Sequence, residues 1–300
     1  MEFGLKLDQQ NFDSVEELFF LESDHFLPRD FLRCLTTCEH FASFRQQAVS
    51  FIEQAQFSCS CDPDVAYVAI NYVHQFISRK KIMELKPWIA RLTAVTCITL
   101  ASKMMNTPLS INQLQALDQE FTFDSRSINR MELLILDMLN WRMRSITPFS
   151  FFPFFISLME LNDELERAIQ ARATYLIFKA LNDVKLLEFK PSITAASAIL
   201  VAHREFSPLS FHSARCSVLS IQNLNSDKLE ECFTSFLRML TEETYECSES
   251  NCTERTVQAE DGDGSEIVTS CDCDADSSSS MVTSVNLRWD TTKDRDNALN

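Results

Sequence analysis

The sequence predicts an all-α protein, built as two tandem five-helix domains and followed by a disordered acidic tail. Two observations carry this prediction. Apolar residues recur at helical spacing along most of the chain, and two segments that begin with Lys-Pro are apolar on every side. A third observation concerns glycine, which occurs only at Gly4, Gly262 and Gly264. Glycine-rich phosphate-binding loops and the strained turn of nucleophile-elbow hydrolases are therefore excluded.

The first of the two apolar segments, residues 87–105, is expected to be the central helix of the first domain. Pro87 suits the first turn of a helix, and no charged residue lies between Leu92 and Ser102. A helix that is apolar all round must be covered all round, and this one is too short to cross a bilayer. Lys103 is expected to emerge where the helix ends.

Changes in pattern and composition divide the chain into four parts. Residues 1–27 are expected to be irregular and acidic, residues 28–146 to form the first domain, and residues 147–241 to form a second, degenerate copy of it. Residues 242–300 are expected to be a disordered tail, because 15 acidic residues face 4 basic ones from residue 241 onward.

Helical periodicity and capping residues give the expected helices. In the first domain five helices, over residues 28–39, 42–56, 63–78, 110–118 and 124–141, are expected to surround the central helix over residues 87–105. In the second domain the marked segments are an aromatic helix around residues 148–155 and helices over residues 163–181, 192–204 and 226–240.

Charge and cysteine content limit the class of partner and cofactor. The net charge of −16 opposes direct binding to nucleic acid or to an anionic membrane. Without a secretory segment the chain is expected inside the cell, with its 11 cysteines mostly reduced. A zinc site is the less favoured interpretation of Cys34, Cys38, Cys59 and Cys61, because the Cys59–Cys61 gap is too tight. We expect no metal and no cofactor.

Several motifs that follow one another in order resemble the cyclin box. They are R-Q-Q-A-V-S-F at residues 45–51, Y-V-A-I-N-Y at 67–72, K-P-W at 86–88, A-S-K at 101–103, R-M-E-L-L-I-L at 130–136 and W-R-M-R-S-I-T-P-F-S-F at 141–151. The third and the last resemble plant D-type cyclins in particular. The second domain, through L-E-F-K-P at 187–191, is most similar to their short, divergent sixth subgroup.

This resemblance, which covers residues 26–240, implies a regulatory subunit without catalytic activity of its own. Such a subunit binds and activates a cyclin-dependent serine/threonine kinase and controls cell-cycle progression at G1/S or a formative cell division. In the family a lysine and a glutamate contact the kinase, and here they match Lys103 and Glu132. Its expected location is the nucleus, with a cytoplasmic pool. The alternative is a helical interaction protein of the same shape that binds partners without activating a kinase.

Two further sites follow from the family pattern, and both depart from it. A candidate substrate-docking patch lacks its usual acids and comprises Phe44, Arg45, Ala48 and Phe51. A candidate degenerate docking motif for a retinoblastoma-related protein has phenylalanine in place of cysteine and comprises Leu18, Phe20 and Glu22. In addition, Met105 and Asn106 follow Lys103 where the family commonly has two acids, and His74 replaces an aspartate. Joint exposure of Lys103 and Glu132 favours kinase contact, whereas burial of either favours the alternative.

Overall fold

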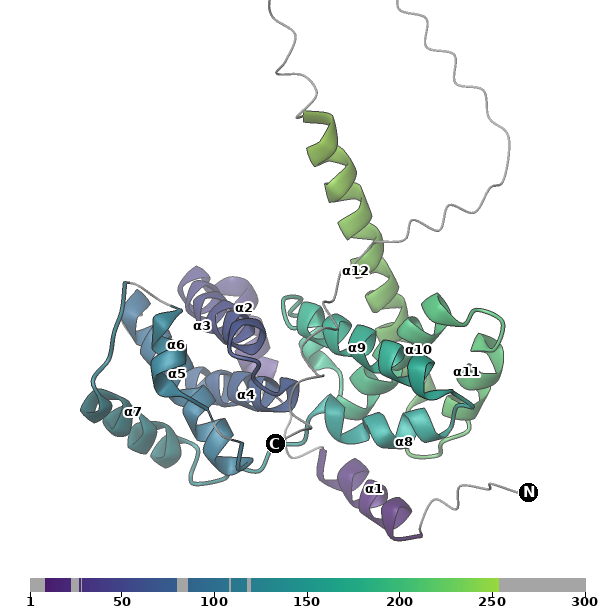
Figure 1. Cartoon of the computed structure of the whole chain (residues 1–300), viewed down its shortest axis with the longest axis horizontal. Coiled ribbons are helices and arrows are strands. Elements are labelled where there is room, and N and C mark those ends of the chain that lie inside the picture. The colour runs from purple at the N-terminus through teal and green to yellow at the C-terminus, as the bar shows by residue number, and fades with distance from the viewer. Residues whose placement is uncertain are drawn as a thin grey trace, which may run out of the picture. The chain divides into compact units, whose positions relative to one another are not determined.

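The computed structural model describes residues 9–22, 27, 29–79, 86–107, 109–117 and 120–253, and among them no strand occurs. The all-α prediction is therefore confirmed over these residues. The chain divides into two compact units, Met1–Asn251 and Cys252–Asn300, and the two helical bundles both belong to the first. Figure 1 shows the helices between residues 29 and 138 gathered in one bundle and those from residue 148 onward in a second.

The first bundle is organised around α5 (Pro87–Met104), as the sequence predicts. This helix packs against α3, α4 and α7 (Figure 1). The predicted helix starts at Ser110 and Asp124 are confirmed, since each side chain accepts a hydrogen bond from the backbone N–H three residues later. The other helices of this bundle are α2 (Arg29–Thr37), α3 (Glu39–Ser58), α4 (Pro63–Arg79), α6 (Ile111–Ala116) and α7 (Ser125–Met138).

Helix α5 is buried on all sides from Leu92 to Ser102. The buried threonine hydroxyl groups of this helix are hydrogen-bonded. Thr93 Oγ1 donates to the Ile89 carbonyl at 2.7 Å, and Thr96 Oγ1 donates to the Leu92 carbonyl at 2.6 Å. Because these bonds close within the helix itself, small polar residues can be buried without a partner from a neighbouring helix.

The second bundle repeats this plan around α10 (Pro191–Phe206), which also begins with Lys-Pro and is buried from Ser192 to His203. Its other elements are η2 (Pro148–Phe151), α8 (Phe152–Ser157), α9 (Asp163–Ala180), η3 (Leu186–Glu188), α11 (Phe211–Leu219) and α12 (Ser226–Thr253). The sequence pattern does not mark α11. Only Ala214 and Val218 of this helix are buried, which is too few apolar positions to show a period.

The segment 1–27, expected to be irregular, contains helix α1 (Gln9–Leu21) instead. Val15, Leu18 and Phe19 lie at helical spacing, and they pack against the apolar core of the second bundle. A helix of this length is marginal in water by itself, so its stability depends on that contact. Local composition does not reveal the contact because the residues that cover α1 lie far along the chain.

The C-terminal boundary also differs from the prediction. Helix α12 continues past residue 241, where the disordered tail is expected to begin, and ends at Thr253. Arg238 Nε and Glu242 Oε1, one turn apart, lie 3.9 Å from each other and support the helix across this boundary. Residues 254–300, the rest of the expected tail, lie outside the described residues.

Candidate functional site

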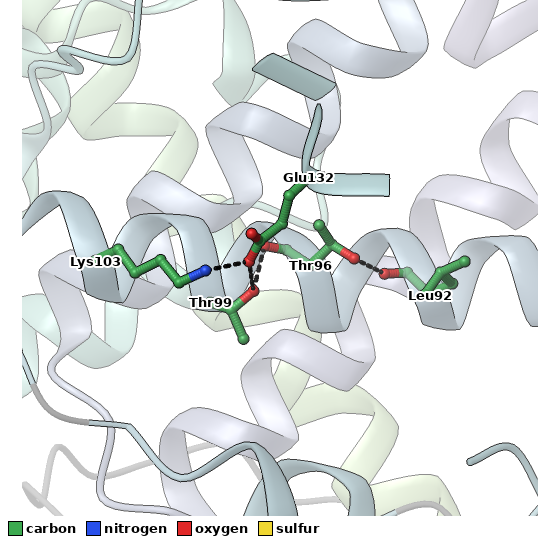
Figure 2. Close-up of polar contacts among 5 residues, drawn as sticks. All are labelled: Leu92, Thr96, Thr99, Lys103 and Glu132. Atoms are coloured by element: carbon green, nitrogen blue, oxygen red, sulfur yellow. Dashed lines mark hydrogen bonds and ion pairs between the residues drawn. The ribbon is translucent and has the colours of Figure 1, made fainter. Parts of the chain in front are cut away.

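Lys103 and Glu132 meet at one end of the first bundle (Figure 2). Lys103 lies in the last turn of α5, and its Nζ is 2.6 Å from Oε1 of Glu132 on α7. The same carboxylate oxygen accepts a hydrogen bond of 3.2 Å from Thr99 Oγ1, one turn earlier on α5 (Figure 2). The structure thus brings together the two residues that the family pattern identifies. It adds Thr99, which sequence reasoning did not single out.

The two charged side chains differ in exposure. The exposed fraction is 58% for the Lys103 side chain and 12% for Glu132. The carboxylate is therefore mostly covered and held by two donors, whereas the ammonium group stays accessible. A lysine ammonium has three N–H donors, and the bond to Glu132 uses one of them. The arrangement can present an oriented positive charge to an acceptor on another protein.

The end of α5 fixes the position of Lys103. The Met105 N–H closes the last turn, and Asn106 leaves the helix in the left-handed region with φ of 53°. Ser102 Oγ donates to the carbonyl of Thr107, which ties the following chain back to the helix. A lysine in the last turn also interacts favourably with the helix dipole. The backbone position of Lys103 is therefore fixed by the end of α5.

Exposed apolar side chains are the sequence neighbours of this pair on both helices. Met104 on α5 is 51% exposed, and Leu133 and Leu134 on α7 are 60% and 39% exposed. Single exposed apolar residues are common on protein surfaces. Their occurrence beside an oriented charged pair is the composition expected of a protein–protein interface, where apolar anchors accompany a few polar contacts.

The candidate substrate-docking patch is not a surface in this structure. Phe44, Ala48 and Phe51 are buried in the core of the first bundle, and Arg45 is buried as well. The guanidinium group of Arg91 lies over the Phe51 ring, 5.0 Å from its centroid. The four side chains are covered, so no exposed patch occurs at this position in the structure, and substrate docking here stays a prediction. An apolar stripe at helical spacing is typical of a covered helix face. The sequence alone does not show which residues cover it.

Arg45 instead joins the two bundles. Its Nε donates to His74 Nε2 at 3.0 Å, and its Nη2 donates to the carbonyl of Leu181 just after α9. Burial lowers the pKa of Arg45 to about 10. Burial and the neighbouring Arg45 charge lower the pKa of His74 well below 6.5, so its ring is neutral and can accept the bond. The sequence did not predict this contact. The histidine at position 74, where the family commonly has an aspartate, was the feature that could have indicated it.

The candidate retinoblastoma-docking residues lie on different sides of α1 and the turn after it. Phe20 is 81% exposed, Leu18 is partly buried and Glu22 is buried. The Glu22 carboxylate accepts hydrogen bonds of 3.0 Å from both the N–H and the Oγ of Ser192. Burial raises the pKa of Glu22, while the bonds from Ser192 and the charge of Lys190 act in the opposite direction. Glu22 is thus engaged within the chain, and docking through this motif stays a prediction.

Within the part of the chain that the structure describes, no group of three or more His, Cys, Asp or Glu side chains is arranged to hold a metal ion. None of the described helices combines the length and the apolar character that crossing a bilayer requires. The lysine–glutamate pair therefore remains the best-defined candidate site.

Two family models match the sequence in tandem. The cyclin N-terminal domain matches residues 13–144, and the cyclin C-terminal domain matches residues 146–260. The fold is also similar to a solved viral cyclin from herpesvirus saimiri, with a TM-score of 0.58 and 15% sequence identity, over 75% of this chain and 96% of that one. The two family models, together with relatives of more than 30% identity, show that the chain belongs to the cyclin family.

Within that family the similarity is to plant D-type cyclins. The chain is 36% identical over 231 residues to putative cyclin-D6-1 of Arabidopsis thaliana, covering 75% of this chain and 76% of that protein. It is 38% identical over 195 residues to cyclin-D6-1 of Oryza sativa subsp. japonica, covering 63% of this chain and 61% of that protein. The resemblance to the sixth D-type subgroup is thereby confirmed.

Proposed function

We propose that this chain is the regulatory subunit of a cyclin-dependent serine/threonine kinase, which it binds and activates to control G1/S progression or a formative cell division. Membership of the cyclin family supports the class of function. The observation that carries the site is the Lys103–Glu132 pair, held at 2.6 Å at the exposed end of α5. The chain itself needs no catalytic group for this role, because it acts by positioning the kinase.

The physical contribution of the pair lies in its preorganisation. Glu132 and the helix end fix the lysine before the kinase arrives, so less side-chain freedom is lost on binding. Removing one partner of a charged pair that becomes desolvated in a complex costs about 2–5 kcal/mol of binding free energy. The low end of that range corresponds to a loss of about thirtyfold in affinity. Exposed Met104 and Leu133 would add apolar area around it.

The test compares three variants in kinase co-purification and kinase-activity assays. Lys103→Ala and Glu132→Ala are expected to lose both binding and activation while retaining their helicity. Arg215→Ala is the matched control, because it removes an ion pair of similar length, 2.7 Å to Glu230, from the second bundle. The control is expected to behave as wild type. Normal kinase recovery and activation by both folded alanine variants would contradict the proposal.

A second function, partner binding without kinase activation, is favoured by one feature of the same site. Glu132 is mostly covered, and Met105 and Asn106 follow Lys103 where two acids are common in the family. The two functions separate when binding and activation are measured on the same purified complex. A kinase that binds the chain tightly and stays inactive supports this second function, whereas an active kinase supports the first.

Nuclear location with a cytoplasmic pool, and docking to a retinoblastoma-related protein, are further parts of the proposal. A fluorescent fusion of the whole chain tests the location directly. For docking, Phe20→Ala is the informative variant, because Phe20 is 81% exposed and its removal leaves the α1 contacts with the second bundle intact. Capture of the retinoblastoma-related protein by wild type, lost in Phe20→Ala, would support docking. Equal capture by both chains would contradict a role for this motif.

A further inference from the structure

The N-terminus of α10 holds a carboxylate from a distant part of the chain. Glu22 Oε2 accepts the N–H of Ser192, and Glu22 Oε1 accepts its hydroxyl, each at 3.0 Å. Lys190 Nζ lies 3.5 Å from Oε1. The first turn of a helix offers unpaired N–H groups and a positive dipole end, which favour an anion. Here the anion is present, 99% buried, and supplied by the segment that follows α1.

An aromatic contact lies beside this anion site. The Phe19 ring centroid is 5.0 Å from that of Phe151 and 6.1 Å from that of Phe154, and the second of these contacts is edge-on. All three phenylalanines are buried in the core of the second bundle. Phe19 and Glu22 are three residues apart and therefore lie on the same face of one helical turn. One face of α1 thus presents a ring and a carboxylate to two adjacent features of the second bundle.

The exposed side chains of α1 between residues 15 and 21 contribute little. Glu16, Glu17 and Phe20 are exposed, and the contact of Glu17 with Arg144 is a long surface pair of 4.0 Å. A 13-residue helix is marginal in water when isolated, so α1 depends on its contact with the second bundle. Ordering of the helix and binding to this surface are therefore coupled.

We propose that Phe151, Phe154, Lys190 and Ser192 form a helix-binding site on the second bundle, which recognises a phenylalanine and a glutamate three residues apart. Helix α1 occupies this site as an intramolecular ligand. The partner that fits is an amphipathic helix of the same chemistry on another protein, and it binds only when α1 leaves. Because α1 is tethered, its effective concentration at the site is of millimolar order, so the site is closed in the free chain.

The probe is a fluorescent peptide with the sequence of residues 9–22. Wild-type full-length chain is expected to bind it poorly. A full-length Phe19→Ala/Glu22→Gln chain, whose own α1 cannot compete, is expected to bind it about tenfold or more tightly than wild type does. Adding Lys190→Glu to that chain places a like charge beside the peptide carboxylate and should remove the gain. Equal affinity of wild type and the double variant would overturn the proposal.

Peptide variants supply the matched controls. Each peptide is titrated against the full-length Phe19→Ala/Glu22→Gln chain. In a Phe20→Ala peptide the ring that is removed is 81% exposed in α1. This peptide is therefore expected to bind as tightly as the wild-type peptide. Phe19→Ala and Glu22→Gln peptides are expected to lose binding. Similar affinity of all four peptides would show that no Phe-x-x-Glu recognition exists.

A second measurement uses only the wild-type chain, so it does not depend on the folding of any variant. Excess peptide is expected to displace α1 and to speed amide hydrogen exchange in residues 15–21 of the protein, while exchange in α10 stays slow. The Glu22→Gln peptide at the same concentration should leave that exchange unchanged. Unchanged exchange in α1 at saturating wild-type peptide would overturn the proposal.

Discussion

Helices α5 and α10 are built alike, and they differ at their ends. Both begin with Lys-Pro, both are rich in small residues and both are buried along their middle turns. Helix α5 ends in Lys103, which is exposed and paired with Glu132. The last turn of α10 contains His203 and Arg204. His203 is buried against Ser210, and Arg204 lies over the Phe211 ring at 6.0 Å.

The two helices also differ at their N-terminal ends, where α10 has the additional contact. The first turn of α10 receives the Glu22 carboxylate, whereas α5 begins at Lys86 without a side-chain cap. The repeated middle therefore serves stability, and the unrepeated ends carry the candidate sites, at the C-terminus of α5 and at the N-terminus of α10. The predictions below test first the shared part and then the parts that differ.

The largest effect on stability is expected from added volume in the shared middle. Ala101 and Ala198 have no exposed surface, so leucine at either position must displace its neighbours. Overpacking of this kind costs about 1–3 kcal/mol or more. Ala171→Leu is the matched control, because Ala171 is exposed on α9. Thermal unfolding should show a clear loss for Ala101→Leu and Ala198→Leu and almost none for Ala171→Leu. Equal melting temperatures in all three would contradict the central position of both helices.

The next largest loss of stability is expected at His74, which contacts Arg45 where the two bundles meet. Alanine at this position removes the acceptor of the buried Arg45 Nε–H and leaves a cavity. A buried donor without a partner costs about 1–3 kcal/mol, and more when it is charged. His74→Gln retains an acceptor oxygen and is the matched control. Denaturant unfolding should show a large loss for His74→Ala and a small one for His74→Gln; equal losses would indicate that the Arg45 bond contributes nothing.

The same histidine predicts a pH dependence. Burial and Arg45 hold the folded-state pKa of His74 well below 6.5, so the unfolded chain binds the proton first as pH falls. Stability is therefore fully present above pH 6.5 and is lost below it. Between pH 6.5 and 5.5 the loss relative to His74→Gln is expected to be about 1 kcal/mol. Parallel stability curves for the two chains over this interval would show that the pKa of His74 is the same in the folded and the unfolded chain.

The smallest effect is expected where α5 and α10 differ most visibly. Lys103→Ala removes a side chain that is 58% exposed, and surface ion pairs contribute about 0–1 kcal/mol. The free energy of unfolding of the unbound chain should change by no more than that. A loss comparable with that of Ala101→Leu would show that Lys103 is a structural residue of the bundle.

The central helices and the Lys103–Glu132 site also differ in how far the sequence predicted them. The central helix and its copy were predictable, because a helix without a polar face has to be covered whatever surrounds it. Lys103 and Glu132 came from the family pattern, and their spacing alone did not distinguish them from a surface ion pair. Thr99 joins them only in three dimensions, because its hydroxyl reaches α7 from one turn away.

Contacts between residues far apart in sequence were the ones that the sequence did not predict. Glu22 and Ser192 are 170 positions apart, and no local pattern indicates that the residue after α1 contacts the first turn of α10. The candidate docking patch on α3 is covered by contacts that the sequence does not show: Arg91 lies over the Phe51 ring, and Arg45 donates to the carbonyl of Leu181 after α9. Helix α12 extends beyond the predicted boundary because composition indicates weak burial and does not exclude a polar helix.

The central claim is that the C-terminal end of α5 binds the kinase and that the corresponding end of α10 does not. The most direct measurement is calorimetric titration of a purified cyclin-dependent kinase with wild type, Lys103→Ala, Glu132→Ala, the double variant and Arg204→Ala. A loss of about thirtyfold or more in affinity is expected for Lys103→Ala and for Glu132→Ala. The double variant should lose little more than either single one, because the two residues act as a unit. Arg204→Ala should bind as wild type. Affinities within about twofold of wild type for every variant, all of them folded, would contradict the account.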